Sequence, residues 1–231
     1  MKLSAFLLPF MITFLPALAI GQDRQYQPKC TDDAMMLSAN TLKKARILLP
    51  VFRHYCYSDQ SGKHVLYLTE KQDKVYANEK LSSAVEAHLF TLESDNSFSL
   101  PVRIRDKADS EEAGIGFWSK LVELKDIDGD GLIDPILVYR VYDQKDSNAV
   151  NTDAYSGRIK IILLYKGSKV VIRAITGTLD GERQTTATEN FFLLPASMQK
   201  YLVKKMAKMY ELDQYGFDNS YKFVPRKVKS K

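Results

Sequence analysis

The sequence predicts an α+β protein, in which a largely antiparallel β-sheet domain carries an N-terminal helix and a C-terminal amphipathic helix. Residues 51–57, 64–70 and 85–93 alternate apolar and polar side chains and are rich in β-branched and aromatic types, as half-buried strands are. Short polar stretches separate them, which favours antiparallel pairing because parallel strands need a long crossover connection. Residues 195–212 instead repeat their apolar side chains at helical spacing.

The first half of the chain is expected to begin with a helix over residues 31–48. Thr31 or Asp32 can cap its start, and Pro50 ends it because the residue before a proline is biased away from helical geometry. Four strands are then expected at 51–57, 64–70, 85–93 and 99–105.

The second half is expected to supply further strands. Residues 117–125 and 135–143 are strand-like on either side of an aspartate-rich loop. Residues 158–167 and 169–181 are expected to form a hairpin that turns at Gly167 and Ser168.

A helix is expected to begin at Pro195, because proline is well suited to the first helical turn. Its apolar residues fall on one face, which favours contact with the core over a ligand site. They are Met198, Tyr201, Leu202, Met206, Met209 and Tyr210.

The N-terminus has the layout of a secretory signal peptide over residues 1–21. Lys2 supplies the positive charge, residues 3–20 are almost wholly apolar, and small residues precede a cleavage site after Ala19 or Gly21. A membrane anchor is disfavoured because Pro9 and Pro16 interrupt a segment that is already short for a membrane span. We therefore expect a periplasmic or secreted protein with no transmembrane segment after cleavage.

The remaining chain is expected to form a single α+β domain over residues 22–215, since this length can bury a sizeable core. Residues 216–231 end in the basic run RKVKSK and are expected to be a flexible tail. The net charge of +5 is mild, and no aromatic residues interleave the basic run, so no nucleic-acid partner is expected.

Cys30 and Cys56 are the only cysteines. In an oxidising compartment an isolated pair usually forms a disulfide, and no CxxC spacing favours a metal site or a redox pair. A Cys30–Cys56 disulfide is therefore expected, joining the N-terminal segment to the first strand.

The stretch KDIDGDGLIDPILVYR, residues 125–140, carries the chemistry of the chain. Its aspartates occupy positions 1, 3, 5 and 9 of a loop at residues 126–134, with a glycine at position 6. Carboxylates so close together repel one another unless a cation offsets their charge, and oxygen-only ligands favour Ca²⁺. The expected ligands of a structural Ca²⁺ ion are Asp126, Asp128, Asp130, the main-chain carbonyl of Leu132, and Asp134.

The surroundings of this loop distinguish it from an EF-hand, which needs a glutamate at position 12 and an exiting helix. Here position 12 is Leu137 in a strand-like run, and Pro135 opposes a helix. An acidic turn that binds no metal is the alternative, and Mg²⁺ suits the loop less because it demands tight octahedral geometry.

The pattern DxDGDGxxD followed by a strand resembles the calcium loops of integrin-type FG-GAP repeats and of the related VCBS repeats. The wider layout consists of the signal peptide, the early cysteine and the stretches DIDGDGLIDPILVYR, RIKIILLYKG and IRAITGTLDGER. This layout resembles a little-studied family of exported bacterial proteins associated with surface polysaccharide biosynthesis. This resemblance implies a periplasmic location more than any activity.

The sequence favours a non-catalytic calcium-binding protein that binds a protein partner or a cell-envelope glycan. One alternative is an enzyme acting on envelope polysaccharide, for which Asp180 with Glu182, or Glu111 with Glu112, are the carboxylate pairs available. Another is a periplasmic inhibitor or immunity protein. No GxSxG, HExxH, phosphate-binding or dinucleotide-binding motif occurs.

Overall fold

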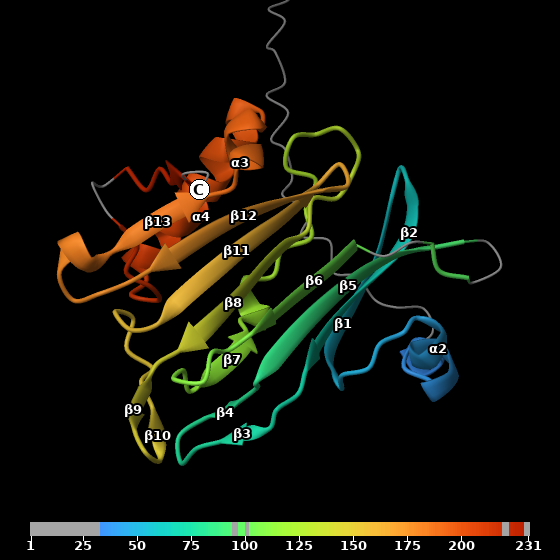
Figure 1. The fold of residues 1–231 in the computed structure, drawn as a ribbon. Coiled ribbons are helices and arrows are strands. Elements are labelled where there is room, and N and C mark those ends of the chain that lie inside the picture. The colour runs from blue at the N-terminus through green and yellow to red at the C-terminus, as the bar shows by residue number, and fades with distance from the viewer. Residues whose placement is uncertain (1–32, 94–96, 100–101, 219–221, 229–231) are drawn as a thin grey trace, which may run out of the picture.

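The computed structural model describes residues 33–93, 97–99, 102–218 and 222–228. It confirms the α+β class, with mostly antiparallel sheets, several short helices and one 16-residue helix near the C-terminus (Figure 1). The predicted signal peptide and Cys30 lie outside the described residues, so the cleavage site and the Cys30–Cys56 disulfide stay predictions.

The first sheet, sheet I, has the strand order β1-β2-β5-β6, and every neighbouring pair is antiparallel. A tight turn at Gln60 and Ser61 joins β1 to β2, whereas residues 71–83, which include β3 and β4, connect β2 to β5. The strands are β1 (Val51–Asp59), β2 (Gly62–Glu70), β5 (Ala84–Leu92) and β6 (Val102–Lys107).

The second sheet, sheet II, has the order β14-β13-β12-β11-β8-β7, and only the pair β13–β14 is parallel. The long strands β8, β11 and β12 are nearly continuous runs of Ile, Leu and Val, which fits their central position. The strands are β7 (Gly114–Phe117), β8 (Ile136–Tyr142), β11 (Arg158–Tyr165), β12 (Ser168–Ile175), β13 (Gln184–Ala187) and β14 (Arg226–Lys227).

The remaining elements are short hairpins and helices, apart from α4. They are α1 (Asp33–Met36), α2 (Ala39–Lys44), β3 (Lys74–Val75), β4 (Lys80–Leu81), η1 (Ser119–Leu121), β9 (Gln144–Asp146), β10 (Ala149–Val150), η2 (Asp180–Glu182), α3 (Glu189–Leu193) and α4 (Ala196–Glu211).

The two sheets pack against each other through a shared apolar core. On β2, the alternation of the strand directs Leu66 and Leu68 toward sheet II and Val65 and Tyr67 toward the opposite face. The buried residues of this inter-sheet core are Tyr57, Leu66, Leu68, Val85, Ala87, Ile104, Ile115, Phe117, Leu124, Leu137, Tyr139, Val141, Ile162, Leu164 and Val171.

Helices and loops cover the two outer faces. Ala45 and Ile47, which follow α2, pack on the outer face of sheet I with Tyr67 and Phe90. The predicted apolar face of α4 packs on the outer face of sheet II, and Met198, Leu202, Met206 and Met209 are its buried residues. The protein therefore stacks in four layers, with α2, sheet I, sheet II and the α3–α4 pair in that order (Figure 1).

Three predicted elements differ from the structure, and one of them is the strand expected over 169–181, which ends at Ile175. The helix expected over 31–48 is two short helices, because the Ser38 hydroxyl accepts a hydrogen bond from the amide of Thr41 at 3.2 Å and caps a new start. The strand expected over 117–125 ends at Phe117; a 3₁₀ turn follows, and only Glu123 pairs again, with Ile136.

Residues 216–231 are expected as a flexible tail, and some of the described residues in this range contribute to the fold. Phe217 and Phe223 are buried in the core beneath α4, and β14 pairs with β13. The apolar side chains between the charged residues explain this difference, because burying two phenylalanines holds the segment against the domain.

Candidate metal centre

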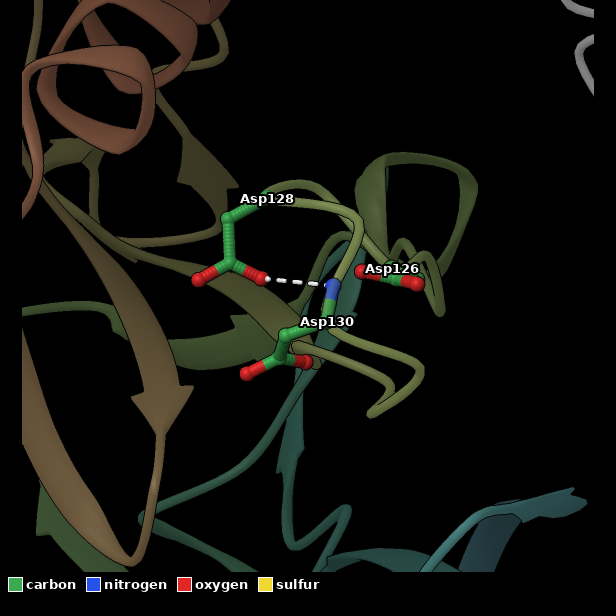
Figure 2. A group of neighbouring side chains, drawn as sticks. All are labelled: Asp126, Asp128 and Asp130. Carbon is green, nitrogen blue, oxygen red and sulfur yellow. Dashed lines mark hydrogen bonds between the residues drawn. The ribbon is translucent and has the colours of Figure 1, made fainter.

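The aspartate loop brings three carboxylates together. Oxygen atoms of Asp126, Asp128 and Asp130 all lie within 4.8 Å of one another, and Figure 2 shows the three side chains around one bend of the loop. This arrangement can hold a metal ion. It is the part of the predicted site that the structure brings together.

Two glycines let the loop curl around its own carboxylates. Gly129 has φ +79° and Gly131 has φ +86°, which are left-handed values that glycine adopts without strain. The Asp126 carboxylate accepts hydrogen bonds from the amides of Gly129 at 2.7 Å and Gly131 at 2.9 Å. The loop is thus organised around the first aspartate.

The next two aspartates are also hydrogen-bonded to the loop backbone. The amide of Asp130 donates to Asp128 at 3.4 Å, and the amide of Leu132 donates to Asp130 at 2.9 Å (Figure 2 draws the first). A carboxylate oxygen has two acceptor positions, so these bonds orient the side chains and leave lone pairs free.

Asp134 is buried apart from the cluster of three. It is 2% exposed, and its carboxylate accepts a hydrogen bond from the amide of Ile127 at 3.0 Å. Burial raises the pKa of Asp134 to about 6, and the negative charges of the other three loop aspartates act in the same direction. The roles of Asp134 and of the Leu132 carbonyl as ligands stay predictions.

The β1–β2 turn of sheet I holds the loop from one side. The Asp59 carboxylate accepts a hydrogen bond from the amide of Ile133 at 3.0 Å, and the amide of Gln60 donates to the carbonyl of Gly131 at 3.1 Å. The Gln60 side chain lies so close that a Cβ on Gly131 would be 1.9 Å from its Nε2. His64 Nε2 lies 3.2 Å from Asp59 and links the turn to β2.

The β11–β12 turn of sheet II holds the loop from the other side. The Tyr165 hydroxyl donates to Asp128 Oδ2 at 2.9 Å. The Lys166 ammonium lies 2.7 Å from Asp130 Oδ2 and 3.8 Å from Asp128 Oδ2. This contact lowers the pKa of Asp130 and raises the pKa of Lys166.

Sequence reasoning did not identify Asp59, Gln60, Tyr165 or Lys166 as neighbours of the loop. Asp59 is 74 residues from its partner in the loop, and Tyr165 is 37 residues from Asp128. Their positions at hairpin turns were the only available signal, and such a signal does not say which loop a turn will contact.

Three of the four carboxylates considered for catalysis contact other groups of the protein, namely Glu112, Asp180 and Glu182. Arg158 contacts Glu112 at 2.6 Å, and Glu182 accepts a hydrogen bond from the amide of Leu179 at 3.0 Å. Asp180 lies 3.4 Å from Arg183. Each of these carboxylates therefore already has a partner within the protein.

A second feature is a polar groove of about 780 Å³, which lies between the β9–β10 region and two neighbouring turns. Its lining carries amide, hydroxyl, carboxylate and ammonium groups. The lining residues are Asn78, Lys145, Ala149, Val150, Asn151, Thr152, Asp153, Tyr155, Ser156 and Thr178.

Three side chains fix the walls of this polar groove. Asn78 bonds both the amide and the carbonyl of Val150, at 3.0 and 2.9 Å. Arg183 donates to the carbonyl of Thr178 at 3.0 Å, and its guanidinium lies 4.8 Å from the ring centre of Tyr155. Arg140 donates hydrogen bonds to two residues of the lining, Asp153 and Ser156.

Arg140 is a buried guanidinium, 2% exposed, that donates to the carbonyls of Asp153 and Ser156. The rings of Trp118, Tyr142 and Tyr215 surround it at 5.5, 4.9 and 5.7 Å. Burial lowers the pKa of Arg140. Burying a cation is costly unless it is hydrogen-bonded, and these two carbonyl groups satisfy part of the guanidinium.

Over the residues that the structure describes, no helix is long and apolar enough to cross a membrane. Comparisons of the chain with known protein families, with curated proteins and with solved structures found no match. The assignment of a metal centre therefore rests on the aspartate cluster itself.

Proposed function

We propose that this chain is a non-catalytic, periplasmic or secreted protein whose aspartate loop binds a structural Ca²⁺ ion. The observation that carries the proposal is the cluster of Asp126, Asp128 and Asp130, with oxygen atoms of all three within 4.8 Å of one another. Ca²⁺ is the cation favoured because it accepts a flexible shell of six to eight oxygen atoms.

The position of the loop supports a structural role for the ion. The loop contacts a turn of sheet I through Asp59 and Gln60, and a turn of sheet II through Tyr165 and Lys166. An ion that fixes the loop therefore strengthens the contact between both sheets. Because the ion binds the folded chain, it raises stability by mass action.

Thermal unfolding in millimolar Ca²⁺ and in chelator tests this proposal. The wild type is expected to melt at a higher temperature in Ca²⁺, and the double variant Asp128→Ala/Asp130→Ala is expected to melt at one temperature in both. Mg²⁺ in place of Ca²⁺ is expected to give a smaller shift. Equal melting of the wild type in Ca²⁺ and chelator would refute a calcium site.

The polar groove is the surface we propose for partner binding, and a glycan suits it better than a protein. Amide and hydroxyl groups both donate and accept hydrogen bonds, which matches the hydroxyl groups of a sugar. The groove has the volume of a small-ligand site, and its walls are fixed in advance. A protein partner remains the alternative for the same surface.

Amide NMR during titration with neutral oligosaccharides tests the groove. Chitotriose and maltotriose serve as probes, and the resonances expected to shift are those of Asn78, residues 145–156 and Thr178. Thr152→Tyr is expected to fill the groove and abolish the shifts while leaving the response to Ca²⁺ intact. Shifts confined to other surfaces would contradict this binding site.

A further inference from the structure

Lys166 lies at a fixed corner of the β11–β12 hairpin. It has φ +47° and is followed by Gly167 with φ +74°, the paired left-handed values of a tight hairpin turn. Tyr165, the last residue of β11, donates its hydroxyl to Asp128. The hairpin turn therefore places Lys166 beside the aspartate cluster, from a separate element of the fold.

The ammonium occupies oxygen atoms that a metal ion would use. It lies 2.7 Å from Asp130 Oδ2 and 3.8 Å from Asp128 Oδ2, and both carboxylates belong to the cluster of three. One ammonium carries one positive charge, whereas the cluster carries three negative charges when ionised. Lys166 therefore offsets only part of the negative charge of the loop.

We propose that Lys166 is the counter-cation of the loop in the absence of Ca²⁺, and that Ca²⁺ binding releases it from Asp130. This inference rests on the calcium site proposed above. A divalent ion and an ammonium repel each other when they share the same carboxylates. Lys166 consequently lowers the affinity of the loop for Ca²⁺ and couples ion binding to the position of the β11–β12 turn.

Stability measured with and without Ca²⁺ distinguishes a competing counter-cation from a purely structural salt bridge. A structural pair contributes the same stability with and without Ca²⁺. A competing counter-cation stabilises the metal-free protein and opposes the metal-bound one. Replacing Lys166 therefore has effects of opposite sign on metal-free stability and on calcium affinity.

The experiment compares Lys166→Met and Lys166→Gln with a matched control, Lys169→Met. Lys169 lies on β12 of the same hairpin and is exposed. Its replacement by methionine removes the same charge, but Lys169 forms no ion pair with the loop. Calorimetric titration with Ca²⁺ measures affinity, and melting in chelator and in Ca²⁺ measures stability. Both Lys166 variants are expected to bind Ca²⁺ about threefold to tenfold more tightly than wild type, with the gain shrinking in high salt.

The same variants are expected to melt lower than wild type in chelator and to recover in saturating Ca²⁺, while Lys169→Met resembles wild type throughout. Equal affinity in the Lys166 and Lys169 variants, or equal losses of stability with and without Ca²⁺, would overturn the inference and leave the calcium site standing. Binding by the Lys166 variants but not the wild type would support it. Absence of binding by every chain would remove the proposed function and this inference together.

Discussion

Among the polar contacts that join sheet I to sheet II, two bridges balance their charges in different ways. In one, Asp106 of β6 contacts the ammonium of Lys160 on β11 and the hydroxyl of Tyr139 on β8. In the other, Lys166 of the β11–β12 turn pairs with Asp128 and Asp130 of the aspartate loop, and Asp59 accepts a hydrogen bond from the loop amide of Ile133. The first bridge is complete within the chain, whereas the second has an excess of carboxylates.

The charge balance of each bridge determines whether the bridge depends on ions in solution. A carboxylate with one ammonium and one hydroxyl partner is neutralised and hydrogen-bonded, so it needs nothing from solution. A cluster with more carboxylates than cations is stable only if protons or a bound cation reduce its charge. We therefore expect the Asp106 bridge to be indifferent to Ca²⁺ and the aspartate loop to depend on it.

The largest effect is expected at the bridge that is complete. Lys160→Met leaves the mostly buried Asp106 carboxylate without its ammonium partner, and is expected to destabilise the protein by about 2–3 kcal/mol. Urea unfolding should show the same loss in Ca²⁺ and in chelator. The control is Lys107→Met, an exposed lysine next to Asp106 that contributes only its backbone amide to that carboxylate. If Ca²⁺ restored the stability lost in Lys160→Met, the two bridges would not differ in their dependence on Ca²⁺.

A smaller loss of folding stability is expected from Asp126→Ala, measured in chelator. Asp126 accepts hydrogen bonds from two loop amides, whereas Asp130 accepts one. Asp126→Ala is therefore expected to cost about 1–2 kcal/mol without metal, and Asp130→Ala less. Both should abolish the stabilisation by Ca²⁺ in the same melting assay. Retention of the Ca²⁺ response in both variants would place the ion elsewhere.

The sequence predicts these two bridges unequally. The aspartate spacing is local, so the loop at 126–134 and its acidic cluster can be identified from sixteen consecutive residues. The Asp106 bridge joins residues on three strands, and neither Asp106 nor Lys160 belongs to a motif. Asp59 and Lys166 escape prediction for the same reason, since the packing of the sheets decides which turns meet the loop.

The fold shows a similar limit. Alternation and composition predict most strands, but they do not assign each face to a neighbour. Strand β2 is buried along both faces from His64 to Glu70, because sheet II covers one face and the segment after α2 covers the other. After residue 215 the charged residues outnumber the phenylalanines, so composition predicts a flexible tail, although Phe217 and Phe223 are buried.

Two glycine variants distinguish the effect of the contact with sheet I from the effect of the left-handed loop backbone. Gly131→Ala and Gly129→Ala impose the same left-handed strain, but a Cβ at 131 meets Gln60 and a Cβ at 129 meets nothing within 4 Å. Each is expected to cost about 1 kcal/mol from strain, with Gly131→Ala the costlier of the two. Urea unfolding in chelator measures both. Equal losses would mean that Gln60 moves aside freely and that its side chain does not hold the loop.

The smallest expected effect is a pH dependence of the Asp106 bridge. Burial acts to raise the pKa of Asp106, but the contacts with Lys160 and Tyr139 outweigh it and lower the pKa below the ordinary aspartate value. A depressed pKa means that the ionised form stabilises the folded state above the unfolded pKa, near about 3.9. This contribution is lost as the pH falls through the lower folded-state pKa.

Asp106→Asn isolates that contribution, because the other titrating groups cancel in the difference between the two proteins. In chelator, the variant is expected to be less stable than wild type at neutral pH, by a margin that is constant down to about pH 5. Below about pH 4 the margin should narrow, since the wild type then loses the ionised carboxylate that the variant never had. Urea unfolding between about pH 3 and 7 measures it. A margin that stays constant to the lowest pH would show that the fold does not favour the ionised form of Asp106, and the contrast with the aspartate loop would then lose its electrostatic basis.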